Sequence, residues 1–318
     1  MAALDKNTLS STPPGRRIRT CPLRRILGDR AFTMIELLIV IAIIAVLISV
    51  MAPSLSRARL LAKQTRELNA ARQLMLAVSC YAGDNRGSVL VGFPTEAMVS
   101  GGMVVVDDKG NRLYSHSAQR YPWRIAPYLA NSFGSLYDNP KVLSELRDAE
   151  PQLIQMGVQY PYIVSLYPTL GMNTRFIGGS DASGAFSKKT IEAIGTPFIT
   201  RIDEPRRPSR LMMFASARGD AQAALPGMGI LQGYFSITPP WWTTKIWADA
   251  YVENPVDPKN PQSATYIERN SGFVSLRYAG RAVASAMDGH AEMLGWTEMN
   301  DMTRWADKAT ASDWRVSK

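Results

Sequence analysis

The chain of 318 residues is poor in cysteine and histidine, with two of each. Cys21 lies in a basic N-terminal stretch, so Cys80 is the only cysteine beyond residue 31 and that part of the chain forms no internal disulfide. The hydrophobic core alone must therefore stabilise the part of the chain beyond residue 31. We expect Cys80 to be a small buried residue on a helix, with an intermolecular bridge as the alternative. His116 and His290, without a cysteine cluster, argue against a zinc site.

Recognisable catalytic motifs are also missing. The sequence has no Gly-x-Ser-x-Gly elbow and no phosphate-binding loop, and the glycines from Gly227 to Gly233 have the wrong spacing for a dinucleotide fingerprint. A membrane-anchored hydrolase would need a nucleophile or a metal set, and neither is evident in the sequence. We therefore predict that the protein is not an enzyme and carries no cofactor.

Two short acidic segments have some of the features of metal sites. Asp107-x-Lys109-x-Asn111 superficially resembles a calcium loop, but it lacks the distal Glu and has a Lys at a ligand position. Asp288-Gly289 has the composition of a tight turn, since Gly tolerates the positive φ that such turns need. We interpret both segments as turns, and a calcium site remains the alternative.

Positive charge is concentrated at the N-terminus. Residues 1–31 carry seven basic and two acidic side chains, which gives +5, and the remaining 29 basic and 25 acidic residues give the other +4 of the net +9. The charge is thus poor evidence for a nucleic-acid partner. Residues 1–31 also have little to bury, and we expect them to be disordered.

A long uncharged run follows the basic stretch. Residues 37–56 are twenty residues without a charge, the length that a helix needs to cross a bilayer. Eleven of the first fourteen are Leu, Ile or Val, which favours insertion by about 3–6 kcal/mol. Glu36 at the edge opposes it by no more than about 2.5–3.5 kcal/mol. The positive-inside rule then predicts a cytoplasmic N-terminus and an exported C-terminal part.

The segment Phe32-Thr33-Met34-Ile35-Glu36 after a basic leader resembles the cleavage and methylation signal of type IV prepilins and type II secretion pseudopilins. In that family the leader is removed before a Phe, here Phe32, which becomes the N-methylated first residue. The fifth mature residue is Glu, here Glu36, and a Pro near the twenty-second position, here Pro53, kinks the helix. The residue before the cut is usually Gly, whereas this chain has Ala31.

The resemblance gives Glu36 a role in assembly. In the family this carboxylate is thought to neutralise the N-terminal ammonium of a neighbouring subunit, because two charges in hydrocarbon are tolerated when they are paired. The alternative is an interfacial Glu that ends the span. An ordinary secretory signal peptide or a plain signal anchor is the alternative for residues 1–50, but no small-x-small cleavage site followed by a polar mature start comes after the apolar run.

Helical periodicity continues beyond the membrane-length run. Apolar residues recur at i, i+3 and i+4 up to Val78, with Arg66 and Glu67 among the residues of the polar face, and Gly83 begins a stretch that stops the helix. We predict three parts: a leader at residues 1–31, a transmembrane and spine helix at 32–82, and a periplasmic head at 83–318.

The head contains shorter segments. The patterns predict a hairpin over 103–114, one or two short helices within 120–150, strands at 162–167 and 211–215, and an irregular stretch over 233–262. Residues 273–294 should form a three-stranded meander whose second turn is Asp288-Gly289.

This meander resembles the C-terminal box of a pseudopilin-like group common in planctomycetes, which is marked by His, nine residues and Asp-Gly. Asp288-Gly289 matches, but Tyr278 stands where His is expected. The resemblance extends through Gly171-Met172-Asn173 and residues 301–305. It implies an α+β, pilin-like fold with a long N-terminal transmembrane and spine helix packed on an antiparallel, β-rich globular head.

The predicted function is that of a structural pseudopilin-like subunit of a type II secretion or type IV pilus-like filament. The implied partners are other pseudopilin subunits, the inner-membrane secretion platform, the prepilin peptidase and methyltransferase, and the inner membrane. The alternative is a membrane-anchored periplasmic module that binds glycan or protein without assembling. Trp241, Trp242 and Trp247 could then stack on a ligand, although core packing is the favoured interpretation.

Overall fold

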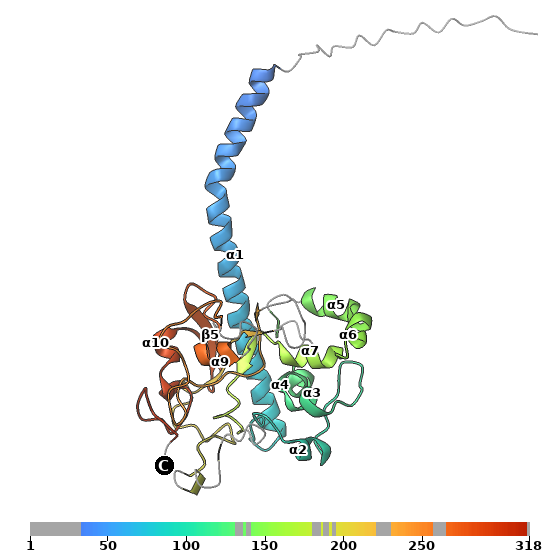
Figure 1. The fold of residues 1–318 in the computed structure, drawn as a ribbon, viewed down its shortest axis with the longest axis vertical. Helices are drawn as coiled ribbons and strands as arrows, with labels where there is room; N and C mark the ends of the chain where they lie inside the picture. The colour runs from blue at the N-terminus through green and yellow to red at the C-terminus, as the bar shows by residue number, and fades with distance from the viewer. Residues whose placement is uncertain are drawn as a thin grey trace, which may run out of the picture. The chain divides into compact units, whose positions relative to one another are not determined.

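The computed structural model describes residues 33–130, 136–137, 141–179, 186, 191–192, 195–220, 230–256 and 265–316. The chain forms two compact units, Met1–Ser54 and Leu55–Lys318. The long helix α1 (Met34–Asp84) contributes to both units (Figure 1). The predicted leader, including its predicted disorder, lies outside the described residues.

The part of α1 in the first unit is apolar and exposed around its whole circumference. Among the described helices, α1 has an 18-residue window that is long and apolar enough to cross a membrane, with none of that window buried in the protein. Apolar side chains that are exposed all round are expected where a helix lies in lipid or packs against other helices. The sequence predicted such a helix over 32–82, close to the observed bounds.

The part of α1 in the second unit is amphipathic. Its buried residues follow helical spacing and are Glu67, Ala70, Ala71, Leu74, Met75, Ala77, Val78 and Ala82. Two sequence predictions are wrong here. Cys80 is exposed, because it lies off this stripe, whereas Glu67, which was assigned to the polar face, lies on the stripe and is 2% exposed.

The exposure of Cys80 has a direct chemical consequence. In detergent-solubilised native protein, a maleimide should label Cys80 as completely as in unfolded protein. Because Cys21 lies in the predicted leader, a cleaved chain should take up one label and an uncleaved chain two, as counted by intact-mass spectrometry. A cysteine that reacts only after unfolding would contradict the exposed position.

The centre of the second unit is a four-stranded antiparallel sheet. Its strand order is β1 (Leu170–Met172), β2 (Met212–Ser216), β5 (Arg281–Ala286) and β6 (Ala291–Gly295). The register pairs Gly171 with Ala215, Ala215 with Ala284, and Val283 with Met293. A separate two-stranded ribbon joins β3 (Gly219–Asp220) and β4 (Ile230–Leu231). Together with the long apolar helix, the sheet gives the α+β, pilin-like class that was predicted.

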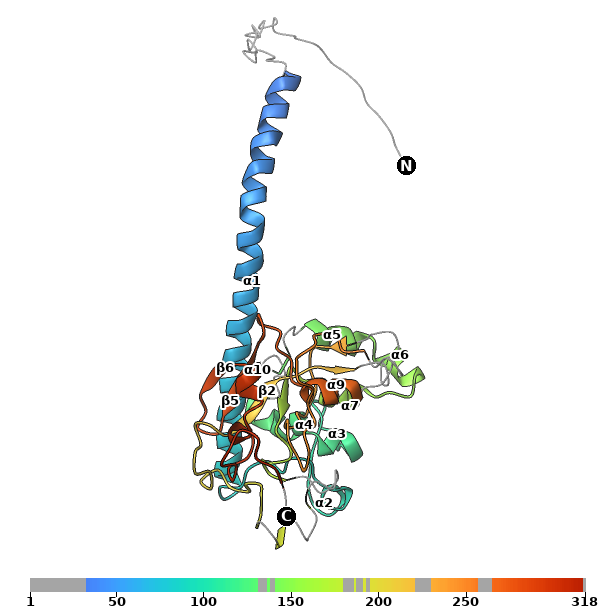
Figure 2. The same ribbon diagram turned by 60° about the vertical axis from the view of Figure 1, so that its left-hand side comes forward.

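Short helices surround the sheet. They are α2 (Glu96–Ser100), α3 (Ser115–Gln119), α4 (Tyr121–Ile125), η1 (Ala126–Leu129), α5 (Lys141–Asp148), α6 (Glu150–Gln155), α7 (Tyr160–Leu166), α9 (Thr265–Ser271), α10 (Trp296–Met299) and η3 (Met302–Arg304). Helices α3, α4 and α7 contact one another, and α10 packs beside β6 (Figure 2). The head is therefore a mixture of helices and strands.

Two hydrophobic cores pack against the sheet, and residues of its strands contribute to one or the other. The first joins α1 to α4 and the strands through buried residues that include Leu74, Met75, Val78, Tyr121, Trp123, Met172, Phe214 and Val283. The second is formed by the C-terminal part of the chain and includes Trp247, Ala284, Leu294, Met302 and Trp305. Cys80, the one cysteine among the described residues, is free, so this apolar burial holds the head together.

The strand predicted at 162–167 is wrong, because residues 162–166 belong to helix α7 and Tyr167 caps its C-terminal end. Aromatic and β-branched residues in this segment favour a strand locally, but Pro161 occupies the first turn of the helix, where its missing N–H costs nothing. Tyr160, Ile163 and Val164 are buried at helical spacing. Contacts with α3 and α4 thus decide the conformation.

The three-stranded meander predicted over 273–294 is half correct. Strands β5 and β6 form the Asp-Gly hairpin, and Gly289 has φ +92° at its turn. Residues 273–278 do not form a strand and make isolated bridges to Ala217 and Arg281. Positive φ angles at Phe273 and Ala279 interrupt the extended backbone on both sides.

Of three other predictions for the head, one is confirmed only in part and two are confirmed. The hairpin over 103–114 is reduced to one bridge between Val106 and Arg112. The strand predicted at 211–215 is β2, and residues 233–256 form an irregular stretch as predicted. Residues 257–262 of that predicted stretch lie outside the described part of the chain.

Candidate functional site

The first turn of α1 holds Glu36, the residue that the sequence singled out for assembly. Thr33 donates two hydrogen bonds to Glu36 Oε2, each 2.9 Å long, from its backbone N–H and from its hydroxyl. In return, the Glu36 N–H donates to Thr33 Oγ1 at 3.2 Å. This reciprocal pair is a capping box, which satisfies N–H groups that a helix start leaves without partners. Ala31 and Phe32 lie outside the described residues.

Pro53 lies within α1, one residue before the end of the first unit. A proline inside a helix has no N–H for the carbonyl four residues before it, here that of Ser49, and its ring crowds that carbonyl. The expected consequence is a local kink or weak point in the helix. The neighbouring hydroxyls of Ser49 and Ser54 each donate back to a carbonyl three residues earlier.

A buried carboxylate on the second part of α1, Glu67, was not predicted from the sequence. Glu67 accepts hydrogen bonds from the Ser216 hydroxyl of β2 and, at 2.6 Å, from the Tyr278 hydroxyl. Ser216 Oγ in turn accepts the Val283 N–H of β5 at 2.9 Å. The carboxylate therefore connects α1 to two neighbouring strands of the sheet and to the segment before β5.

Arg277 supplies the positive charge beside this carboxylate. Its Nε lies 3.9 Å from Glu67 Oε2, too long for a hydrogen bond but close enough for a strong attraction in a buried site. Its Nη2 donates to the carbonyls of Thr169 and Ala217, while Nε and Nη1 have no hydrogen-bond partner among the described residues. The negative charge of Glu67 thus compensates the positive charge of the buried Arg277 guanidinium.

Tyr278 is the residue that stands in the His position of the predicted C-terminal box. Its ring is buried, and its hydroxyl is one of the two groups that hold Glu67. A signal for this contact exists in the sequence, since Glu67 lies four and seven residues before Ala71 and Leu74, on the apolar face. A charged residue on such a face predicts a buried partner.

The acidic segments considered for calcium are turns in the structure. Asp107 Oδ1 accepts the N–H groups of Lys109 at 2.9 Å and Asn111 at 2.7 Å, and Oδ2 accepts the Asn111 side chain at 3.0 Å. Asp288 Oδ1 accepts the His290 N–H at 3.1 Å and contacts its Nδ1 at 2.6 Å. Among the described residues no group of three His, Cys, Asp or Glu side chains is placed to hold a metal ion.

The Asp107 turn gives a prediction with a defined pH dependence. Burial raises the pKa of Asp107, but the hydrogen bonds from Asn111 and Lys109 outweigh it and hold the pKa below its usual value. The turn's contribution is therefore present above about pH 4 and is lost as the pH falls through the folded-state pKa. Asp107→Ala should cost about 1 kcal/mol at pH 7 in urea unfolding, and this difference should shrink in acid. A pH-independent cost would contradict the role of the charge.

The tryptophans considered as a stacking surface contribute to the core. Trp247 is buried, donates from Nε1 to the Thr238 carbonyl at 2.9 Å, and stacks on Trp296 with ring centroids 5.3 Å apart. Trp241 and Trp242 are half-buried and pack against the second core. The geometry fits core packing, the interpretation that the sequence favoured.

Comparisons with known proteins identify one feature. The family model described as the prokaryotic N-terminal methylation motif matches residues 27–52, which include Phe32 and Glu36. No curated protein and no solved structure matches the chain. The chain therefore carries the prepilin-type methylation motif on a long apolar helix.

Proposed function

We propose that this protein is a pseudopilin-like structural subunit whose leader is removed before Phe32 and whose mature chain assembles into a type II secretion or type IV pilus-like filament. The observation that carries the proposal is the match of the methylation motif to residues 27–52. The exposed apolar surface of α1 supports it, because such a surface needs lipid or neighbouring helices to cover it.

Each predicted residue has a role in this proposal. Ala31 and Phe32 form the processing site, and Phe32 becomes the methylated N-terminus. Glu36 pairs with the N-terminal ammonium of a neighbouring subunit, since an unpaired charge in hydrocarbon is costly. Pro53 weakens the helix locally so that it can adjust to its neighbours.

The proposed location follows from the order of the segments. The basic leader stays in the cytoplasm, the apolar helix crosses the inner membrane once, and the head faces the periplasm. The partners are the prepilin peptidase and methyltransferase before assembly, and other pseudopilin subunits with the inner-membrane platform afterwards. Catalysis has no part in this function.

Crosslinking in native membranes tests the proposal. An assembled subunit should give crosslinks between its head and the heads of other proteins that carry the same N-terminal motif, identified by mass spectrometry. Crosslinks confined to proteins without that motif would instead indicate an anchored module that does not assemble. Membranes in which the prepilin peptidase gene is deleted provide the control, because the motif-bearing crosslinks should disappear there.

A further inference from the structure

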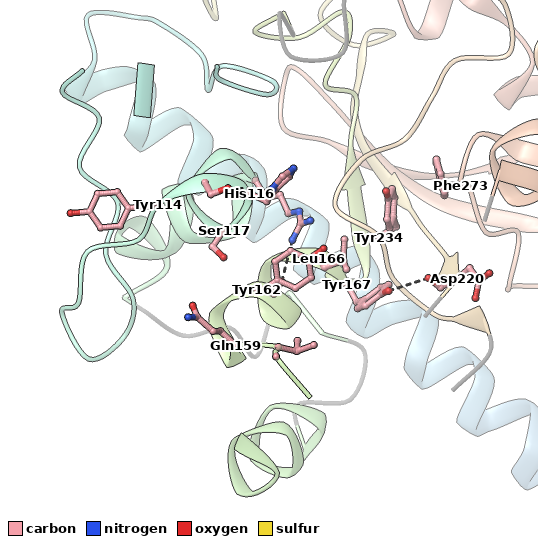
Figure 3. A pocket seen from close by; sticks show the side chains of 14 residues that line it. Tyr114, His116, Ser117, Gln159, Tyr162, Leu166, Tyr167, Asp220, Tyr234 and Phe273 are labelled. Carbon is pink, nitrogen blue, oxygen red and sulfur yellow. Dashed lines mark hydrogen bonds between the residues drawn. The ribbon is translucent and has the colours of Figure 1, made fainter. Parts of the chain in front are cut away.

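The second unit contains a cavity to which the proposed processing and assembly roles assign no part. Its volume is about 650 Å³, within the range of small-molecule sites. It is lined by residues of the segment around α3, by α7 and by the chain near β3, Tyr234 and Phe273 (Figure 3). Since these segments are far apart in the sequence, the cavity is a product of the fold.

Aromatic rings form much of its wall. Tyr162 and Tyr167 come from the region of α7, and Tyr234 stacks on Phe273 with centroids 4.2 Å apart and planes at 22°. The Tyr167 hydroxyl donates to the Asp220 carbonyl at 3.0 Å, which fixes this ring (Figure 3). Aromatic rings that are held in place can stack against the C–H face of a sugar or against another aromatic ring.

Arg120 places a positive charge in this wall. It is 4% exposed, and its guanidinium carbon lies 4.4 Å from the centroid of the Tyr162 ring and 5.1 Å from that of Phe235. Nη1 donates to the Tyr162 carbonyl and the Ser165 hydroxyl, but Nε has no hydrogen-bond partner among the described residues. No carboxylate oxygen of the described residues lies within 4.0 Å of its guanidinium nitrogens. A buried cation without a counter-ion favours an anionic ligand.

Two residues with strained backbone line the same cavity. Five described residues other than glycine have a positive φ, and two of them, Ser115 (+52°) and Phe273 (+66°), line the cavity. A positive φ is costly for an aromatic residue, and such strain is found preferentially at binding sites. Polar groups of Ser115, Ser117 and Gln159 add hydrogen-bonding capacity at the wall.

We propose that this cavity binds an acidic oligosaccharide of the uronic-acid type. The carboxylate pairs with Arg120, the sugar faces stack on Tyr162 and Tyr234, and the hydroxyls bond to the polar groups of the wall. A chain terminus of a protein would also offer a carboxylate. The abundance of hydroxyl and amide groups among the aromatic rings favours a polyhydroxylated ligand.

Calorimetric titration of the full chain in detergent tests this assignment, with tri-galacturonate as the probe and neutral galactotriose as its matched control. The acidic trimer should bind saturably, at least about tenfold tighter than the neutral trimer, and more weakly as salt is added. Tyr162→Leu and Arg120→Gln should each weaken it about tenfold. Gln159→Ala, at an exposed position, should weaken it without a risk to folding, and Tyr266→Leu, away from the cavity, should bind as wild type.

Three results would overturn the assignment. The first is that the two trimers bind equally or do not bind. The second is that the affinity for the acidic trimer is unchanged in correctly folded Tyr162→Leu and Gln159→Ala proteins. The third is that a short peptide binds saturably through its free C-terminal carboxylate and the trimer does not. The titration does not depend on filament assembly, so failure of one proposal is distinguishable from failure of the other.

Discussion

Glu67→Leu should destabilise the head by about 3–5 kcal/mol. The substitution leaves the Arg277 guanidinium buried without its compensating charge and deprives the hydroxyls of Ser216 and Tyr278 of their acceptor. Glu67→Gln keeps the shape and one acceptor but loses the charge, so its cost should be intermediate. Urea or thermal unfolding of the detergent-solubilised full chain, followed by near-ultraviolet circular dichroism, measures the effect.

Two further variants test the cause of this effect. Gln73→Leu places the same side chain at an exposed position of the same helix and should change stability by less than about 0.5 kcal/mol. The double variant Glu67→Leu with Arg277→Met removes both charges and should recover much of the loss, as replacement of buried ion pairs by apolar residues does elsewhere. A Glu67→Leu protein as stable as wild type, or a double variant less stable than the single one, would refute the buried-charge explanation.

Glu36→Gln should reach the membrane but be missing from the assembled fraction, with a loss of more than about tenfold. Gln is also suitable for the third position of a capping box, so this variant preserves the helix start seen at Thr33 while removing the charge. A lost pairing free energy of only about 1.4 kcal/mol already changes an equilibrium tenfold.

The measurement is a comparison of total membrane content with the sheared or crosslinked assembled fraction by immunoblotting. Glu36→Asp keeps the charge on a shorter side chain and should retain part of the assembly. If Glu36→Gln assembles as well as wild type, the carboxylate serves only as a helix cap or as the end of the span.

The features that the sequence predicted are those governed by local rules. The long helix follows from an uninterrupted apolar run, and the β5–β6 hairpin follows from Asp288-Gly289, because the turn residue itself determines the backbone conformation. Helix α7 departs from the predicted strand because its composition favours a strand, while the local signal for a helix start is the single residue Pro161.

The Glu67 site could not be predicted in full, because its partners are remote in sequence. Tyr278 is 211 residues away from Glu67 in the chain. The positive φ angles of Phe273 and Ala279 redirect the segment between them, which the sequence suggested was a strand. The pattern of charges placed Glu67 on the polar face of the helix, whereas its spacing from Ala71 and Leu74 places it on the buried face. The identity of its partners depends on the tertiary fold.

The mature N-terminus, determined by mass spectrometry of protein purified from its native membrane, tests the central claim most directly. The proposed function predicts a chain that begins at Phe32 and carries an N-methyl group. A chain that retains residues 1–31, or one that begins after residue 50, would contradict prepilin-type processing and with it the assignment to a filament.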